Sequence, residues 1–200
     1  MALLSNKFDE ALAFASFLHR DQFRKDSDHQ VPYISHLLRV AGLALEYQAD
    51  ETTAIAALLH DAVEDQGGME TAELIRQKFG SKVEAIVLEC SDSTTPKDQK
   101  KKDWKQRKAA YISHFNNNPS QEAVIVCSCD KLDNLTCSFR QLQLVGLSHF
   151  DLFTTARDGF FWYYRSVLQA LYAQKTPLKL ELEACMQKIE ALTEKLSFLQ

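Results

Sequence analysis

The sequence Thr-Thr-Ala-Ile-Ala-Ala-Leu-Leu-His-Asp-Ala-Val-Glu-Asp, residues 52–65, joins an apolar run to a group of polar side chains. Its strong helix formers and apolar residues predict one buried helix along the whole stretch. On that helix His60 would share a side with Glu64, and Asp61 would share one with Glu64 and Asp65. Buried together, an imidazole and three carboxylates need a compensating cation. The stretch therefore predicts a divalent metal site, and the alternative is a helix end that becomes solvated as the chain enters the following glycine pair.

The rest of the chain is predicted to be helical as well. Proline and glycine are scarce, and nearly every segment between them shows helical rather than alternating periodicity. The β-branched run 123–129 also fits a strand, but its polar continuation favours a helix. Asp50 is the predicted N-cap of the central helix, and Gly80 ends another. The predicted helices span residues 8–18, 34–45, 52–65, 71–79, 81–90, 104–115, 120–140, 150–172 and 178–198. The sequence predicts an all-α fold of about eight to ten helices.

Composition and charge exclude several classes of partner. Charged residues make up 25% of the chain and the net charge is −4, which gives no electrostatic case for duplex nucleic acid or an anionic membrane. The N-terminal residues are polar where a signal peptide needs an apolar core, and no apolar run approaches the roughly 20 residues that span a bilayer. The cysteines are odd in number and scattered, which favours free thiols over disulfides. We therefore expect a cytoplasmic protein.

Further candidate ligands lie outside the central stretch. His36 and Asp130 fall in two other predicted helices, and spacing alone does not select them. With His60 and Asp61 they would offer imidazole nitrogens and carboxylate oxygens. Such a set suits Mn, Fe or Zn, and two carboxylates with room for water favour six-coordinate Mn or Fe. A metal with open positions lowers the pKa of bound water and holds a phosphate oxygen, which suits phosphoester hydrolysis.

The order of these residues resembles a known family. The pattern His…His-Asp…Asp is similar to that of the HD-domain metal-dependent phosphohydrolases. Val63-Glu64-Asp65 after the His-Asp pair, and Arg24-Lys25 before Pro-Tyr-Ile-Ser-His, narrow the resemblance to the hydrolase domain of the RelA/SpoT alarmone enzymes. Their small single-domain relatives of the metazoan SpoT-homolog type are included. The matching segments are residues 15–25, 32–40, 56–65, 79–87 and 129–134. Together they reach across about the first 140 residues in the family's order.

The resemblance implies a fold, a metal and a reaction. The fold would be a single HD-domain helical bundle over residues 1–200, with a motif-bearing core at 8–172 and a C-terminal helix at 178–198. One Mn²⁺ per chain, or another divalent metal, would be ligated by His36, His60, Asp61 and Asp130. The reaction implied is removal of pyrophosphate from the 3′ position of guanosine 3′,5′-bis(diphosphate), which leaves GDP. The chain shows no synthetase domain, so we expect it only to degrade this nucleotide.

The same resemblance assigns roles around the metal. Glu64 and Asp65 would orient or deprotonate the attacking water and assist the leaving pyrophosphate. Arg24 would lie near the base, Lys25 near the phosphates, and Asn134 would hydrogen-bond the ribose. Alternatively, Arg24 and Lys25 end a helix and complement its macrodipole. The 5′ phosphates would be met by Lys97, Arg107 and Arg157.

Two departures from the family's pattern concern recognition of the nucleotide. Residues 26–31 contain no glycine, whereas the family often has a short glycine-containing link there. Phe161 stands where small family members place a nucleotide-contacting tyrosine, and it has no hydroxyl. Neither departure touches the metal ligands. The preferred purine therefore stays open, and the adenosine analogue ppApp is a candidate substrate beside ppGpp.

Other functions and placements remain as alternatives. One is an HD phosphohydrolase acting on another nucleotide, such as a 5′-nucleotidase or an NADPH phosphatase. Another is a non-catalytic nucleotide sensor, which would have no need of the complete set of ligands and carboxylates. The last helix would bury its apolar stripe against the domain or in a homodimer. Asp133 is expected to face solvent. Surface or helix-end positions are expected for His19, His29, His114 and His149.

Overall fold

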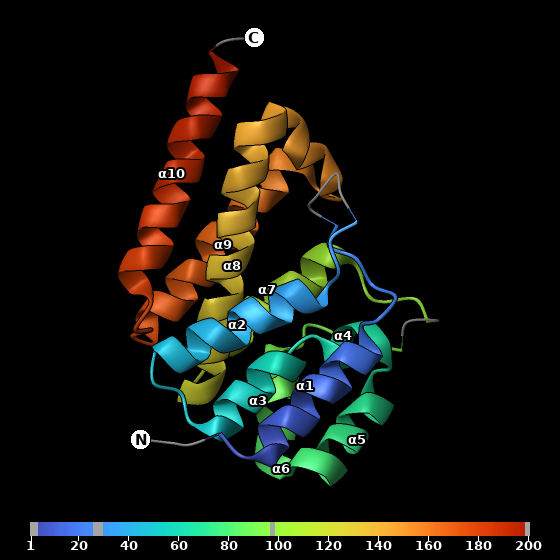
Figure 1. Ribbon diagram of the computed structural model, residues 1–200. Helices are drawn as coiled ribbons and strands as arrows, with labels where there is room; N and C mark the ends of the chain where they lie inside the picture. The colour runs from blue at the N-terminus through green and yellow to red at the C-terminus, as the bar shows by residue number, and fades with distance from the viewer. Residues whose placement is uncertain (1–3, 26–29, 97–98, 199–200) are drawn as a thin grey trace.

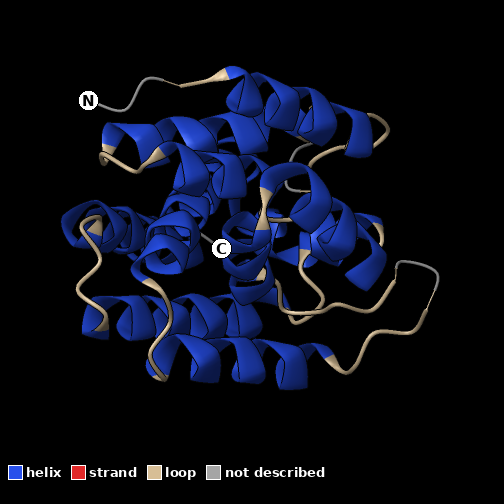
Figure 2. Cartoon of the chain, turned by 90° about the horizontal axis from the view of Figure 1, so that it is seen from below, coloured by secondary structure: helices blue, strands red, loops and turns tan. Residues whose placement is uncertain are grey.

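The computed structural model describes residues 4–25, 30–96 and 99–198, and helices dominate all three segments (Figure 1). The elements are α1 (Asn6–Leu18), α2 (Ile34–Glu46), α3 (Glu51–Leu59), α4 (Ala62–Gln66), α5 (Met69–Phe79), α6 (Ser81–Cys90), α7 (Trp104–Asn116), α8 (Gln121–Val145), η1 (Gly146–Leu152), α9 (Ala156–Ala173) and α10 (Lys179–Ser197). Figure 2 shows helices joined by loops, and an isolated antiparallel bridge between Phe23 and Pro32 is the β-type pairing in these segments. The predicted all-α class is confirmed.

Helix α3 lies at the centre of the N-terminal half because almost its whole surface is buried. Every residue from 53 to 59 is buried, and α3 packs against α1, α2 and α6. The Asp50 carboxylate accepts a hydrogen bond from the Thr53 amide at 2.8 Å, so the predicted N-cap is confirmed. Gly80 ends α5 with a φ of 96°, a conformation that glycine adopts without a steric penalty. This packing fixes the end of α3, where the polar residues begin.

The predicted single helix over residues 52–65 is wrong. Helix α3 ends at Leu59, His60 and Asp61 form a turn, and α4 begins at Ala62. Asp61 has a ψ of −4°, far from the value of about −42° in a regular helix. Neighbouring residues on a regular helix point about 100° apart. The turn therefore lets two adjacent side chains face one point, which a continuous helix would prevent.

The C-terminal half is built along the long helix α8. Helix α10 packs along α8, α2 crosses it, and α7 packs against α9. Figure 1 shows α8 and α10 rising together away from the N-terminal helices. Leu182, Met186 and Ile189 of α10 are buried within this chain. The apolar stripe predicted for the last helix therefore faces α8, the first of its two expected positions.

The predicted helix over residues 150–172 begins later than expected. Gly146, with a φ of 66°, ends α8, and the 3₁₀ segment η1 precedes α9. His149 lies in the last turn of η1 and is completely buried beside Phe150, Phe153 and Phe160. Of its two expected positions it therefore takes the helix end, not the surface. These ring contacts hold η1 and the start of α9 together. The loop between them is thereby placed over α8.

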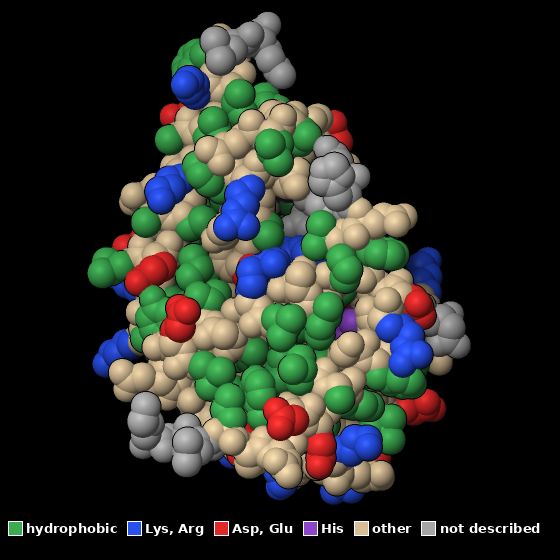
Figure 3. All heavy atoms as spheres, in the orientation of Figure 1, with side chains coloured by type: hydrophobic (Ala, Val, Ile, Leu, Met, Phe, Trp, Pro, Cys, Tyr) green, Lys and Arg blue, Asp and Glu red, His purple; other side chains and the backbone are tan. Residues whose placement is uncertain are grey.

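Charges are mixed on the surface. Figure 3 shows acidic and basic side chains interspersed around a central group of hydrophobic ones on the face in view. This distribution agrees with the small net charge of −4. Within the described ranges, no helix combines the length and the apolar character that crossing a bilayer would require.

Candidate metal centre and its pocket

Four polar side chains from three parts of the chain meet at one point. Helix α2 supplies His36, the turn after α3 supplies His60 and Asp61, and α8 supplies Asp130. His60 Nε2 lies 3.1 Å from Asp61 Oδ2 and 3.7 Å from Asp130 Oδ1. His36 Nε2 lies 3.6 Å from the same Asp61 oxygen and 3.3 Å from the same Asp130 oxygen. The structure therefore brings together the residues that the sequence proposed as metal ligands.

Both histidines are oriented by their other ring nitrogen. His60 Nδ1 donates to the Ala57 carbonyl at 2.8 Å, and His36 Nδ1 donates to Asp133 Oδ2 at 2.6 Å. With the proton on Nδ1, the lone pair of each Nε2 points into the cluster. His60 Nε2 is buried and has no hydrogen-bond partner among the described residues. A buried electron-pair donor that faces two carboxylate oxygens is what a metal ligand requires.

The electrostatics of the cluster demand a positive charge at its centre. Burial would lower the pKa of His36, but hydrogen bonds with Asp130, Asp133 and Asp61 outweigh burial and raise it to about 9. Burial also opposes charge on His60, yet Asp61 and Asp130 raise its pKa well above the usual value. Burial acts to raise the pKa of Asp61, but His60 and His36 hold it well below its ordinary range. Either protons or a cation can supply the positive charge that these shifts reveal.

The donor set fits a divalent transition metal. Candidate ligand atoms of His36, His60 and Asp130 all lie within 4.8 Å of one another. Asp61 adds a second carboxylate from the adjacent turn, so imidazole nitrogen and carboxylate oxygen are equally represented. Nitrogen and oxygen donors of this kind suit Mn, Fe or Zn. Asp61 and Asp130 also line an open pocket, which leaves room for water and a substrate oxygen.

Asp133 is buried, so its expected solvent position is wrong. Its side chain is 4% exposed, and its Oδ2 accepts hydrogen bonds from His36 Nδ1 and, at 3.1 Å, from Arg24 Nη1. Arg39 donates to both carboxylate oxygens. Burial would raise the pKa of Asp133, but the hydrogen bonds with His36 and Arg39 lower it. Asp133 thus joins a candidate metal ligand to Arg24, the residue expected to bind the nucleotide.

Glu64 lies beside the cluster with an unusual acidity. Its Oε1 is 3.5 Å from Arg107 Nη1 and 3.5 Å from Lys101 Nζ. Burial raises the pKa of Glu64 to about 7, Lys108 opposes the rise, and Asp92 adds to it. A carboxyl group with a pKa near neutrality can accept a proton and release it again under ordinary conditions. Glu64 therefore has the acidity of a general base.

Asp65 is held on the other side of the centre by a chain of hydrogen bonds. Gln22 Nε2 donates to Asp65 Oδ2 at 2.7 Å, and His19 Nδ1 lies 2.9 Å from Gln22 Oε1. Burial and the nearby Asp61 raise the pKa of Asp65. Tyr33 donates to Asp61 Oδ2 at 2.6 Å and stacks on His19. Two of the polar residues at the centre are thus fixed by neutral side chains.

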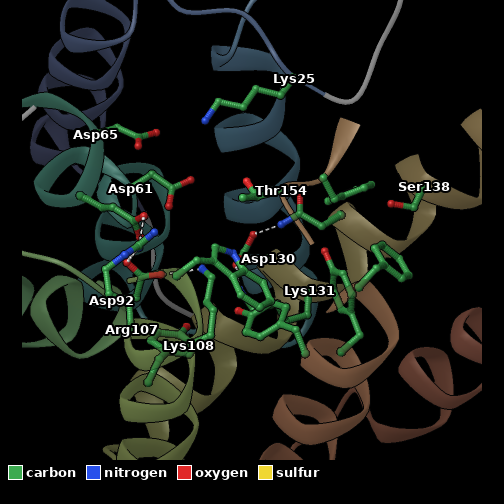
Figure 4. A pocket seen from close by; sticks show the side chains of 18 of the residues that line it. Lys25, Asp61, Asp65, Asp92, Arg107, Lys108, Asp130, Lys131, Ser138 and Thr154 are labelled. Carbon is green, nitrogen blue, oxygen red and sulfur yellow. Dashed lines mark hydrogen bonds and ion pairs between the residues drawn. The ribbon is translucent and has the colours of Figure 1, made fainter. Parts of the chain in front are cut away.

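The cluster opens into a pocket of about 400 Å³. Helices α4 and α8, together with Tyr33 just before α2, form one side of this pocket, and α7, α9 and the loop after η1 form the other. Figure 4 shows Lys25 on one side of Asp61 and Asp130, and Lys108 on the opposite side. The pocket therefore has a basic residue at each end and the acidic candidate ligands between them. Such an arrangement suits an anion with two charged arms.

The predicted substrate contacts divide into those inside and those outside this pocket. Arg24, Lys25, Asn134 and Arg107 line it. Arg157 and Phe161 instead line a separate groove between α9 and α10, where Arg157 Nη1 donates to Ser197 Oγ at 3.2 Å. Phe160, the preceding residue, lines the pocket. Successive helix positions point about 100° apart, so one residue of register decides which ring reaches the pocket. Lys97 lies outside the described residues.

Two of the other histidines lie at helix ends, one of their two expected positions. His19 follows α1 directly as its C-cap, and His114 lies in the last turn of α7, so both are at helix ends. His29 lies outside the described residues. The Asn134 side chain donates to Asp130 Oδ1 at 2.5 Å and accepts from Arg24 Nη2 at 3.0 Å. Asn134 therefore connects a candidate metal ligand with Arg24, as Asp133 does.

Several pocket residues were not expected from the sequence. They are Gln22, Tyr33, Asp92, Lys108, Tyr111, Lys131 and Tyr163. Two of them carried a local signal, because Lys131 follows Asp130 and Lys108 follows Arg107. Asp92 carried none, since it stands in a polar stretch typical of a loop. Its side chain is nevertheless 1% exposed and pairs with Arg107 and, at 2.6 Å, with Lys108.

Comparison with known sequences places this geometry among related proteins. A family model described as HD domain matches residues 11–154. The guanosine-3′,5′-bis(diphosphate) 3′-pyrophosphohydrolase MESH1 of Drosophila melanogaster is 33% identical over 182 residues, which cover 90% of this chain and 92% of the fly protein. A guanosine-3′,5′-bis(diphosphate) 3′-pyrophosphohydrolase of Aquifex aeolicus is 40% identical over 83 residues, 42% of this chain but 11% of the bacterial protein. The similarity to the fly protein therefore spans both chains, whereas the similarity to the longer bacterial protein is confined to one part of it.

Two solved structures are similar to this chain over most of its length. A metazoan ortholog of SpoT, described as hydrolysing ppGpp and acting in starvation responses, superposes with a TM-score of 0.74 at 30% identity. The match covers 94% of this chain and 98% of that one. A protein from Listeria monocytogenes superposes with a TM-score of 0.65 at 27% identity over 80% of this chain and 99% of the other. The arrangement of helices around the centre is thus shared with both proteins.

Proposed function

This chain belongs to the HD-domain family, and we propose that it is a metal-dependent hydrolase that releases pyrophosphate from the 3′ position of guanosine 3′,5′-bis(diphosphate), ppGpp. The convergence of His36, His60, Asp61 and Asp130 beside a pocket with two basic ends carries the proposal. The fly relative, which bears the name of this activity and aligns over nearly its whole length, supports it. The overall reaction consumes one water and yields GDP and pyrophosphate.

We propose Mn²⁺ as the metal. The candidate ligands supply two imidazole nitrogens and two carboxylates, and this mixture with room for further oxygens suits a six-coordinate ion. When bound, such a metal lowers the pKa of a coordinated water and neutralises charge on a phosphate oxygen. The Asp133 carboxylate holds His36 in the tautomer that leaves Nε2 free for the ion. A divalent cation would also replace the protons that the buried histidines otherwise retain.

Glu64 is proposed to accept the proton of the attacking water. A pKa of about 7 makes the Glu64 carboxylate a stronger base than an ordinary carboxylate. At this pKa a useful fraction of Glu64 is still unprotonated near neutrality. The water oxygen forms a bond to the phosphorus that carries the 3′ oxygen, and the bond between that phosphorus and the 3′ oxygen breaks. The leaving 3′ oxygen takes up a proton and becomes the hydroxyl of GDP. Asp65, whose pKa is also raised, is proposed to supply that proton.

The nucleotide is proposed to lie at the end of the pocket that carries Arg24 and Lys25. Arg24 is held by Asp133 and Asn134, so its guanidinium has a fixed position at the pocket wall. Lys25 would meet the 5′ phosphates, and the Asn134 amide would meet the ribose. Because Arg24 contacts residues next to the metal centre, binding of the nucleotide and placement of the reacting phosphate are mechanically linked.

The proposal extends to the location of the protein. All five cysteines are free thiols, and Cys90, Cys127 and Cys129 are buried. Free thiols persist where glutathione and thioredoxin keep cysteine reduced. We therefore propose a cytoplasmic protein acting on a small nucleotide.

The proposed function can be tested by direct turnover. The purified protein, loaded with Mn²⁺, is incubated in parallel with ppGpp, ppApp, NADPH and a nucleoside 5′-monophosphate, and the products are resolved by anion exchange. We expect GDP and pyrophosphate from ppGpp, with the ratio of ppGpp to ppApp rates defining the purine preference. Phosphate release from NADPH or the monophosphate, without turnover of either alarmone, would refute the proposal.

A further inference from the structure

One end of the pocket forms a small chamber built by three helices. Lys108 of α7, Lys131 of α8 and Tyr163 of α9 face one another there. Lys131 Nζ lies 5.5 Å from the centre of the Tyr163 ring and Lys108 Nζ lies 4.9 Å from it. The Tyr111 ring, whose centre is 5.3 Å from Lys131 Nζ, closes another wall. Lys131 and Tyr163 are each only 7% exposed. The chamber therefore holds two ammonium groups in a confined space, one on the buried Lys131 and one on the half-buried Lys108.

Each of the carboxylates Asp92 and Asp130 beside the chamber faces more than one partner. Asp92 pairs with both Lys108 and Arg107. Asp130 Oδ2 accepts from Lys131 at 2.5 Å, while its Oδ1 faces both candidate metal-ligating histidines. A metal ion bound to Asp130 would compete with Lys131 for the charge of that carboxylate. The cations at this end would then exceed the negative charge available to them, which favours an anionic ligand.

The Tyr163 hydroxyl provides an independent observation. Its oxygen is buried and has no hydrogen-bond partner among the described residues, although the side chain lines the pocket. Leaving a buried hydroxyl without a partner is unfavourable, and such groups in native structures usually have a missing partner. An oxygen atom of an anion between the two lysines would accept a hydrogen bond from this hydroxyl. The aromatic walls then orient the lysines, and the hydroxyl completes a set of donors.

The position of the chamber identifies the part of the substrate that it fits. Lys25 and Lys108 lie on opposite sides of the acidic centre (Figure 4). A nucleotide with diphosphates on both the 3′ and 5′ oxygens has two anionic arms, and the bond to be broken lies in the 3′ arm. If the 5′ arm is held near Lys25, the far phosphate of the 3′ arm extends past the metal centre. A purine base in the chamber would bring no negative charge to the two lysines.

We propose that Lys108, Lys131 and Tyr163 bind the terminal phosphate of the 3′ pyrophosphoryl group and hold it as product pyrophosphate after cleavage. This inference rests on the proposed function, because that function places the scissile bond at the metal centre. It assigns the chamber to the pyrophosphoryl group and the opposite end of the pocket to the nucleoside diphosphate. The two products should therefore bind independently, and each should depend on its own lysine.

The test measures binding of the two products separately. The metal-loaded protein is titrated calorimetrically with inorganic pyrophosphate and, in separate runs, with GDP, and its metal content is measured after each run to exclude stripping of the ion. Lys108→Met should weaken pyrophosphate binding about tenfold or more and change GDP binding less than about twofold. Lys25→Met should show the reverse pattern. Lys105→Met is the matched control, because Lys105 lies on the same helix, is exposed, and stacks over Trp162 outside the pocket.

A second variant guards against a folding defect. Lys108→Met removes a partner of the buried Asp92, so its melting temperature must be recorded. Tyr163→Phe removes only a hydroxyl that has no partner, and it should weaken pyrophosphate binding about fivefold while leaving the melting temperature and GDP binding unchanged. Equal effects of either variant on both products, or no pyrophosphate binding to the wild-type protein, would overturn the inference. Failure of the proposed function would appear separately, as the absence of GDP formation from ppGpp by the wild-type protein.

Discussion

The metal side of the site is formed by His36 of α2, His60 and Asp61 of the turn before α4, and Asp130 of α8, and it carries histidines and carboxylates. The basic side is formed by α7, α9 and Lys131 of α8, and it carries lysines, an arginine and tyrosines. The first side concentrates its groups in short sequence motifs, and backbone or carboxylate hydrogen bonds fix each ring. The second side draws single residues from separate helices and holds its lysines by shared carboxylates and aromatic rings. One side is thus organised to bind a cation, and the other to bind an anion.

The contrast suggests a division of labour. On the proposed mechanism, a metal held on the metal side would polarise the reacting phosphate and activate water, while the basic side would neutralise the charge of the pyrophosphoryl group under attack. Glu64 stands at the boundary, because it lies near Arg107 and Lys101 and its acidity responds to Lys108. Two kinds of substitution test this division: those whose effect is confined to one side, and those on one side whose effect reaches the other.

The largest effect is expected from Asp61→Ala on the metal side. The substitution removes a carboxylate that faces both candidate metal-ligating histidines. Loss of the ion should remove several kcal/mol of transition-state stabilisation, so turnover of ppGpp should fall at least about a thousandfold. Metal content after dialysis, measured by plasma mass spectrometry, should fall together with activity. A variant that loses activity while retaining a full equivalent of metal would show that Asp61 is not a ligand.

Glu64→Gln should separate chemistry from metal binding. The amide cannot accept the proton of the attacking water, so kcat should fall about 10²- to 10⁴-fold while the metal content stays at the wild-type level. Glu73→Gln is the control, because Glu73 is exposed on α5 and pairs with Arg76. Retention of near wild-type kcat in Glu64→Gln would remove Glu64 from the proposed mechanism.

Asp133→Asn should weaken the metal side without removing a ligand. The amide is uncharged and supports the His36 tautomer less well, so affinity for Mn²⁺ should fall about 10- to 100-fold. At saturating metal, kcat should recover to within a few-fold of wild type, which a general folding defect would not allow. Asp158→Asn, on the exposed face of α9, is the matched control. An unchanged Mn²⁺ affinity would limit Asp133 to a role in positioning Arg24.

The pH dependence of kcat should reveal the electrostatic effect of Lys108, on the basic side, on Glu64. A protonated Glu64 cannot act as a base, so kcat should fall about tenfold per pH unit below its pKa and be flat above it. The pKa of about 7 applies without an ion, and a bound cation moves the acidic limb lower. Because the Lys108 ammonium acts to lower this pKa, Lys108→Met should move the limb to higher pH, whereas Lys105→Met should not. A limb that moves to lower pH in Lys108→Met would contradict the electrostatic link.

The smallest effect is expected from Phe161→Tyr. Phe161 lies in the groove between α9 and α10, so the added hydroxyl should change the ratio of ppGpp to ppApp turnover less than about twofold. Phe160→Tyr places a hydroxyl at the pocket wall and should change that ratio more. A larger change from Phe161→Tyr than from Phe160→Tyr would show that the register of α9 differs when the nucleotide is bound.

The two sides also differ in how far the sequence predicts them. The all-α class and the Asp50 cap follow from local patterns, and the metal residues follow from motifs that keep their order along the chain. The turn at His60 and Asp61 could not be predicted, because Ala, Leu and Val on both sides favour an uninterrupted helix. The interruption goes with tertiary contacts that lie far away in sequence, of His60 with Asp130 and of Asp61 with Tyr33 and His36.

Most residues of the basic side could not be predicted from the sequence, for a related physical reason. Lys108, Lys131 and Tyr163 come from separate helices, and each alone has the pattern of a solvated or core position. Asp133 was expected in solvent because an isolated carboxylate is costly to bury, and its three cationic or donor partners lie far away in sequence. Phe161 was displaced from the pocket by one residue of helical register. Packing of distant helices, which periodicity does not encode, decides each of these cases.

The most direct measurement is the dependence of GDP formation on metal content. Protein freed of metal with EDTA and then dialysed is titrated with Mn²⁺, and GDP and pyrophosphate are quantified from ppGpp at each step, with Asp61→Ala treated in parallel. We predict that the wild-type rate rises from near zero and levels off at about one equivalent of Mn²⁺ per chain, with both products in equal amounts, and that Asp61→Ala does not respond over this range. Undiminished turnover by the metal-free protein, or no GDP at any metal content, would contradict a metal-dependent 3′-pyrophosphohydrolase.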